Sequence, residues 1–405
     1  MNLFNATIAS FTQSRSIGNG NMFLSSFFGG ASTEAGKKVN HNASMKISAF
    51  WCGVHAICNS IALLPKQIYT SKDDVREHLT DHPVNYLISK EPNECMTQFN
   101  FWFTMILHAL VRGNGFAKIY RNGAGQVVSL EFYESHEVAI YKLEGKLWYQ
   151  ILKTGQWLHS DEMLHIPGFA WNGISGIGVI QYAADNLAIP LNADAFGSDA
   201  FGDRGVSYGI LETDKDLQDK GRKNIAKLLN QSFNTSDKHR LAVFDEGMKY
   251  KRISLTPAEA QFIETKAAGV EDIARWLSVP KFKLHTDGEG GYNYLVEMTI
   301  EFWRSAVAPW TQKIKEEIER KLLTKNEKLA GVFCYINYKK LLEVDPKARA
   351  QYYKDMWFIR AINSNEIRKA EDMNPYKGGD EFLQPANMLS EMQLNNELQN
   401  GTKPD

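Results

Sequence analysis

The chain has 405 residues, of which 43% are hydrophobic and 23% charged, and this balance excludes a largely disordered protein. Its 46 basic and 47 acidic side chains give a formal net charge of −1, which excludes a uniformly basic protein that coats nucleic acid. Any contact with DNA is therefore expected to be local or weak.

The cysteine content and the length of the apolar segments indicate the compartment in which the protein works. Cys52, Cys58, Cys95 and Cys334 are too scattered for a disulfide framework, which indicates a reducing compartment. No run of 18 apolar residues occurs, and the N-terminal segment lacks the basic start and apolar core of a signal peptide. We therefore predict neither a membrane span nor a leader, and place the protein in the cytoplasm or in a particle assembled there.

The chain opens with a segment that is rich in Gly, Ser and Asn, residues 1–43, which predicts a flexible N-terminal arm. Phe27 and Phe28 are apolar anchors within it. The arm either packs on a neighbouring subunit or frays as an ordinary terminus.

Residues 44–170 predict one α+β unit. Apolar residues at three- and four-residue spacing indicate a helix over 44–64, which Pro65 ends, and an aromatic-dense helix over 97–112. Short alternating segments predict strands at KQIYT, FAKIYR, QVVSLEFY, EVAIYKL, LWYQIL and EMLHIP.

The middle of the chain predicts a small subdomain between two helices. The first helix covers 177–203 and is interrupted or kinked near Pro190, and residues 207–254 predict a β-α-β-β insertion. The second helix has Thr256 as N-cap and Glu259 completing a capping box, and Pro280 ends it.

The segment KFKLHTDGEGGYN follows, with three glycines between two long helices. Composition alone favours a plain surface loop over a functional one. A helix over 293–323 with a kink at Pro309, the strand VFCYINY and a helical C-terminal region complete the chain.

Signatures of catalysis are absent from the sequence. It holds no phosphate-binding GxxxxGK[ST], no GxGxxG between strand and helix, no HExxH and no CxxC pair. Cys52, His55 and Cys58 do not share one helix face. We therefore predict no catalytic residue, no cofactor and no metal. One alternative stays open, a hydrolase that uses Ser175 and His165.

Six segments occur in a fixed order along about residues 45–385: SIALLPKQIY, HPVNYLISKEPNECMTQFNF, LVRGNGFAKIYRNGAGQVVSLEF, EMLHIPGF with GISGIGVI, EAQFIETKAAGVEDIARWLSVP, and NSNEIRKAEDMNPYKGGD. Together they resemble the portal proteins of tailed bacteriophages, in the compact class of about 400 residues. The chain departs from that pattern at Ser278, where the family often carries glycine before Val-Pro, and after the glycine-rich loop, where Glu occurs only at position 297.

The resemblance implies an α+β portal fold with an α/β wing, a helical stem, a small α/β clip insertion, a tunnel loop and a helical crown. The implied parts are an arm at 1–43, wing at 44–176, stem helix at 177–206, clip at 207–255, stem helix at 256–280, tunnel loop at 281–293, kinked wing helix and return strand at 294–339, crown at 340–389 and disordered tail at 390–405.

The resemblance also implies a function, namely a ring of about twelve subunits at one capsid vertex of the virion. Double-stranded DNA would pass through it with weak contacts during packaging and ejection. The other implied partners are the terminase large subunit, head-tail connector proteins and the major capsid protein. Another phage head or connector protein is the alternative within the same class.

Two sets of site residues follow from the same resemblance. The tunnel loop that faces DNA would carry Lys281, Lys283, His285, Asp287, Gly288, Glu289, Gly290 and Gly291. The clip that docks motor and connector would carry Asp214, Lys215, Asp216, Lys220, Arg222 and Lys223.

Overall fold

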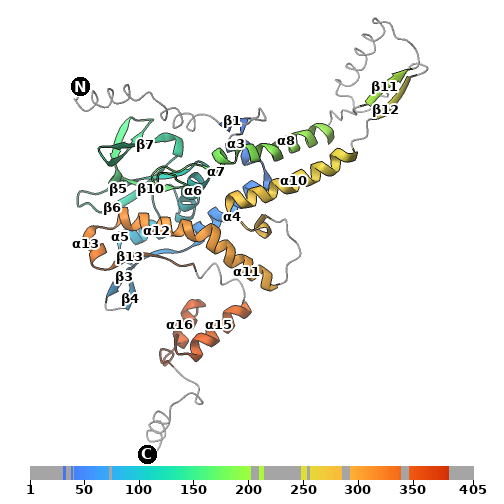
Figure 1. Ribbon diagram of the computed structural model, residues 1–405. Coiled ribbons are helices and arrows are strands. Elements are labelled where there is room, and N and C mark those ends of the chain that lie inside the picture. The colour runs from blue at the N-terminus through green and yellow to red at the C-terminus, as the bar shows by residue number, and fades with distance from the viewer. Residues whose placement is uncertain are drawn as a thin grey trace, which may run out of the picture. The chain divides into compact units, whose positions relative to one another are not determined.

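The computed structural model describes residues 31–32, 38–39, 41–72, 75–201, 209–213, 248–252, 256–284, 292–338 and 346–382 (Figure 1). The chain divides into two compact units, Met1–Ile336 and Asn337–Asp405. Both helices and antiparallel strands build the first unit, so the α+β prediction is confirmed. No described helix is long and apolar enough to cross a membrane.

Two packed helices form the centre of the first unit, α4 (Ser48–Leu63) and α6 (Gln98–Val111). Their apolar stripes face each other, and Phe50, Ile61 and Trp102 are at most 1% exposed. The threonine hydroxyl of Thr97 caps α6 by accepting from the backbone N–H of Asn100. Two of the four Phe and Trp side chains of this aromatic-dense helix, Phe101 and Trp102, are thus buried in the core of the unit.

Helix α4 starts later than its periodicity predicts. The short helix α3 (His41–Ser44) precedes it, and the chain turns before Ser48. Within the predicted arm, β1 (Ala31–Ser32) pairs with β2 (Lys38–Val39) in antiparallel fashion. The last residues of the arm segment thus have regular structure of their own, and residues 1–30 lie outside the described chain.

Three antiparallel sheets of three strands each occur among the described residues. The first sheet has the strand order β10 (Met163–Pro167), β5 (Asn114–Arg121), β6 (Val127–Tyr133), and α6 contacts its strands β5 and β10. The second has the order β13 (Val332–Ile336), β3 (Lys66–Lys72), β4 (Val75–His78). The third has the order β7 (Val138–Leu143), β8 (Lys146–Ile151), β9 (Gln156–His159). The predicted strands are confirmed, and β4 and β9 are additional short edge strands that composition did not mark.

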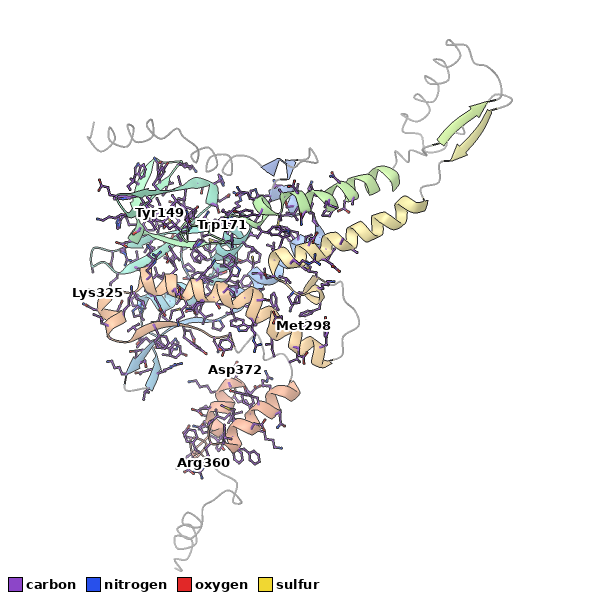
Figure 2. The ribbon with its side chains drawn as sticks, viewed as in Figure 1. Tyr149, Trp171, Met298, Lys325, Arg360 and Asp372 are labelled. Atoms are coloured by element: carbon purple, nitrogen blue, oxygen red, sulfur yellow. The ribbon has the colours of Figure 1, made fainter. Side chains whose placement is uncertain are left out.

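The remaining small elements connect the sheets to the helices. They are α5 (Pro83–Ser89), the 3₁₀ turns η1 (Ser135–Glu137) and η2 (Ser160–Glu162), and α13 (Lys325–Leu329). A buried cluster that includes Phe116, Tyr149 and Leu158 joins the β5 and β8 sheets. Figure 2 shows Tyr149 among these strands.

Strand β10 lies at the edge of its sheet, and the helix α12 (Ala308–Leu322) covers that edge with charged side chains. Lys313 Nζ donates to the carbonyl oxygens of Pro167 and Gly168, and Glu317 accepts from the backbone N–H of His165. One turn further, Lys321 Nζ donates to the carbonyl of Ser160. Spacing of four residues places the three side chains on one helix face, where they satisfy backbone groups of the strand and its flanks.

The second unit contains α15 (Pro346–Phe358) and α16 (Ser364–Ala370). Asn363 and Glu366 form a reciprocal capping box at the start of α16. Arg349 of α15 pairs with Glu371 at 3.0 Å, which joins the two helical segments. The helical C-terminal region is confirmed for these residues, and the predicted tail at 390–405 lies outside the described chain.

Candidate functional site

Two long helices lie side by side, α8 (Ala184–Phe201) and α10 (Thr256–Leu277) (Figure 1). The predicted break in the first of them falls at Ala183, between α7 (Val179–Tyr182) and α8, while Pro190 lies inside α8. A Cβ on Gly269 of α10 would meet the Pro190 ring at 3.7 Å, so the two helices are already in close contact there.

The insertion between these helices is described by its flanking strands. β11 (Gly209–Thr213) pairs in antiparallel fashion with β12 (Met248–Arg252), from Gly209 opposite Arg252 to Thr213 opposite Met248. The candidate clip residues Asp214, Lys215, Asp216, Lys220, Arg222 and Lys223 all lie outside the described residues.

The end of α10 is fixed by backbone geometry. Ser278 adopts the left-handed conformation with φ +54°, its N–H bonds the carbonyl of Arg275, and the next N–H, of Val279, bonds that of Ala274. This is a Schellman cap, in which glycine is preferred at the left-handed position. In this chain Ser278 holds that position and carries a Cβ in the left-handed conformation.

A single turn of 3₁₀ helix, η3 (Lys281–Leu284), follows the cap. Leu284 is 6% exposed, and the Cys52 thiol of α4 donates to the carbonyl of Lys283 at 3.1 Å. Gly53 leaves the room for this packing, because a Cβ there would lie 2.5 Å from Leu277 and 3.2 Å from Leu284. The first four residues of the segment predicted as a flexible loop are therefore ordered, because an apolar anchor and a hydrogen bond attach them to α4.

The two lysines of that turn are engaged within the chain. Lys281 pairs with Glu271 at 2.5 Å, and the ammonium holds the pKa of this carboxyl below its usual value. Arg275 pairs with both Glu271 and Asp272. Two cations and two carboxylates thus balance at the end of α10, in an exposed network that salt screens.

Lys283 lies between aromatic rings. Its Nζ is 5.2 Å from the ring centre of Phe282 and 5.3 Å from that of Phe302. Burial lowers the pKa of Lys283, since the charged form loses hydration, and the ring faces compensate in part. The other candidate loop residues, His285, Asp287, Gly288, Glu289, Gly290 and Gly291, lie outside the described residues.

The chain resumes with α11 (Tyr292–Phe302), a π-helical segment at Trp303–Val307, and α12 with Pro309 in its first turn. A π-helical turn thus precedes Pro309, the residue at which the sequence predicts a kink. Within that turn, the Ser305 hydroxyl donates to the carbonyls of Ser278 and Glu301. This contact was not predictable from the sequence, because it joins residues whose approach depends on the tertiary fold.

The hydrolase alternative fails on the environment of His165. Its ring is buried, Nε2 lies 2.9 Å from Asn114 Oδ1, and the Tyr149 hydroxyl lies 3.1 Å from Nδ1. Burial lowers the pKa of His165 to about 3, so the ring is neutral and both of its nitrogens are engaged. Within the described residues, no hydrogen bond joins the Ser175 side chain to His165. His165 is therefore a packed core residue and not the base of a hydrolase.

Metal binding finds no support in the part of the chain that the structure describes, where no group of three His, Cys, Asp or Glu side chains could hold an ion. Cys52 bonds the carbonyl of Lys283, Cys58 is fully buried, and His55 stacks on Trp51 at 5.7 Å. The three residues of the CxxHxxC stretch thus have separate structural roles.

Comparison with known proteins gives one consistent answer. A family model described as phage portal protein matches residues 48–372. The portal protein of Enterobacteria phage HK97 is 25% identical over 356 residues, which cover 86% of this chain and 84% of that protein.

Two solved structures share the fold. An HK97 family phage portal protein from Corynebacterium diphtheriae has a TM-score of 0.57 at 14% identity and covers 76% of this chain and 98% of its own. A chain from the neck of a native gene transfer agent particle, computed with C12 symmetry, has a TM-score of 0.52 at 17% identity. The match covers 87% of this chain and 99% of that chain.

Proposed function

The chain belongs to the phage portal protein family, and from that premise we propose that it forms a ring at one capsid vertex through which viral DNA enters and leaves. The observation that carries the proposal is the order of elements from α8 to α12. Two packed helices flank an insertion, and the second helix leads through an anchored turn into residues 285–291 and then into a helix with a π turn. This order is the one expected for stem, clip, tunnel loop and wing helix.

The proposed ring has about twelve subunits. A neighbour of the same fold occurs in a neck with C12 symmetry, which supports this number. A closed ring needs heterologous contacts, so each subunit must present two different faces to its neighbours. The location we propose is the portal vertex of the virion.

DNA would slide through this ring with little affinity. Lysines and arginines that bind phosphates release counterions, and many such contacts hold DNA tightly. Here Lys281 and Arg275 pair with carboxylates, and Lys283 is half-buried against aromatic rings. The base of the proposed tunnel loop therefore offers few unpaired cations to the DNA, as a passive sleeve requires.

The partners we propose are double-stranded DNA, the terminase large subunit and connector proteins at the 207–255 insertion, and the major capsid protein. Energy for packaging would come from the terminase. The family is structural, and we propose no catalytic role for this chain.

The mass of the purified full-length protein tests the proposal. A ring of twelve 45.9 kDa chains has a mass of about 550 kDa, which multi-angle light scattering resolves from a monomer or a dimer. A protein that stays monomeric at micromolar concentration would contradict the ring. A defined particle with another subunit number would keep the ring and correct its symmetry.

A further inference from the structure

An exposed group of three aromatic side chains lies where β10 leads into α7, and we call Phe169, Trp171 and Tyr182 the aromatic patch. Their exposed fractions are 58%, 75% and 44%. The rings of Phe169 and Trp171 meet edge to face at 5.4 Å, and the Trp171 indole N–H donates to the Tyr182 hydroxyl. Figure 2 labels Trp171 beside the start of the α8 helix.

The backbone beneath the aromatic patch is held at both ends. The N–H of Gly168 bonds the carbonyl of Gly113 at 2.7 Å, and the N–H of Ile177 bonds that of Phe169 at 2.7 Å. Asn114 accepts from the N–H of Gly176 at 2.8 Å and donates to its carbonyl at 3.0 Å. In the loop itself, Asn172 Oδ1 accepts from the N–H groups of Ile174 and Ser175, both at 2.9 Å.

Glycines make this attachment possible. A Cβ on Gly176 would lie 1.9 Å from the carbonyl oxygen of Gly113, and one on Gly178 would lie 2.1 Å from that of Val111. The loop that presents the aromatic patch is thus fixed before any partner arrives. Binding to a preorganised surface loses less conformational entropy, which favours tight contacts.

The chemistry of the patch favours a protein partner. Residues 168–184 contain no charged side chain, whereas binding to nucleic acid needs Lys or Arg for the phosphates. Exposed aromatic residues in an uncharged setting are typical of the centre of a protein interface. Lys313, which reaches the backbone next to Phe169, is engaged with the carbonyls of Pro167 and Gly168.

The N-terminal arm of this same chain has matching chemistry. Residues 16–33 also contain no charge and include Met22, Phe23, Leu24, Phe27 and Phe28. Thirty residues precede β1, and at about 3.3 Å per residue they can span on the order of 100 Å. They join the described chain beside α8, because β2 and α3 both contact α8, and α7, which carries Tyr182, contacts α8 as well.

We propose that the aromatic patch of one subunit is the seat for the N-terminal arm of the adjacent subunit, with residues 22–28 as the bound segment. The inference rests on the proposed ring, in which neighbours must meet through two different faces. A peptide donated by one subunit to a fixed patch on the next is such a contact. Such a contact would bury apolar side chains of both segments without burying a charge, since neither residues 16–33 nor residues 168–184 contain a charged side chain.

Photocross-linking of the full-length protein tests this pairing. Benzoylphenylalanine in place of Phe169 keeps an aromatic ring in the patch, and the same residue in place of Leu329, which is 79% exposed on α13, is the control. We expect cross-linked subunit pairs from position 169, with the attached peptide within residues 16–33, and none to the arm from position 329. Cross-links from position 169 within one chain, to another region of the neighbour, or to nothing would overturn the proposal.

A double-mutant cycle gives the second readout. Trp171→Ala and deletion of residues 1–30 should each raise the concentration at which rings dissociate by at least about tenfold, and the combination should add nothing further. Additive effects would overturn the pairing. Stable rings without the arm cross-link contradict only this inference, whereas a monomeric wild-type protein contradicts the ring itself. Circular dichroism verifies that each variant is folded.

Discussion

The Ser305 hydroxyl lies 3.1 Å from the carbonyl oxygen of Ser278, and this hydrogen bond joins the π turn after α11 to the end of α10. In the sequence, residues 285–291, the core of the proposed tunnel loop, fall between these two segments. Together with the hydrogen bond from the Cys52 thiol to the carbonyl of Lys283, the Ser305 bond attaches the residues that precede this segment to α4 and to the π turn. The residues before position 285 are therefore held by groups outside the segment 285–291.

The left-handed conformation at Ser278 predicts a stabilising substitution. Glycine adopts φ +54° without the steric penalty that a Cβ brings, so Ser278→Gly should raise the free energy of unfolding by about 1 kcal/mol. Chemical denaturation measures this difference. Ser278→Ala is the matched control: it keeps the Cβ and should give no gain. Equal stabilities for the glycine and alanine variants would contradict the argument.

The loop that presents the aromatic patch depends on close backbone approach. Gly176→Ala places a Cβ against the carbonyl oxygen of Gly113 and should destabilise the fold by about 3 kcal/mol or more, because backbone must move. Gly123→Ala meets no atom within 4 Å and should change stability by less than about 1 kcal/mol. Thermal unfolding of both variants and of the wild type measures the two losses of stability. Equal losses for the two variants would contradict the prediction.

The buried Lys66 predicts a pH dependence. It is 1% exposed, and its Nζ donates to the carbonyls of Ile61 and Leu64 at the end of α4 and lies 5.3 Å from the Trp102 ring centre. Desolvation lowers the pKa of Lys66 from 10.5 to about 7, against a weaker opposing effect of Cys334. Between these values the unfolded chain binds a proton that the folded chain does not, so this lysine costs stability as pH falls from 10.5 to 7.

Lys66→Met removes that titration. The wild type should therefore gain stability relative to the variant as pH rises from 7 to 9, by up to about 1.4 kcal/mol per pH unit. Denaturation of both proteins across this range isolates the contribution of Lys66 from other groups that titrate there. A stability difference that stays constant with pH would show that Lys66 remains charged in the folded state.

The proposed tunnel loop predicts a loss of packaging without a loss of assembly. Deletion of residues 287–291 leaves the anchored turn Lys281–Leu284 in place, so rings should form normally. Packaged, nuclease-protected DNA should fall by about tenfold or more, since the segment proposed to face the DNA is shortened. A variant in which these five residues are replaced by glycine and serine keeps the length of the segment and removes its side-chain chemistry, and so shows which of the two matters. Normal genome length and yield in the deletion variant would remove the functional claim.

Local patterns in the sequence were sufficient for most of the fold. The periodicity of α4 and α6, the alternation of β5 to β8 and the position of Pro309 all predict elements that the structure contains. Their boundaries shift by a few residues, as at Ser48, because the chain turns after α3 for tertiary reasons. The short edge strands β4 and β9 were missed because each has only four residues, too few to show an alternating pattern, and three of the four residues of β4 are exposed.

The candidate site was less accessible to sequence reasoning. Gly-rich composition indicated a loop from residue 281, but Leu284 anchors its first turn in a space that Gly53 leaves open on α4. That packing depends on residues more than 200 positions apart. The aromatic patch was missed for a similar reason: Phe169 and Trp171 read as ordinary apolar residues until their exposure is known.

Electron micrographs of the purified, negatively stained protein test the central claim most directly. We expect annular particles with a central hole and, from the C12 symmetry of a neighbour with this fold, about twelvefold symmetry in averaged end views. Uniform small particles without a hole, at concentrations where the protein is folded, would contradict it.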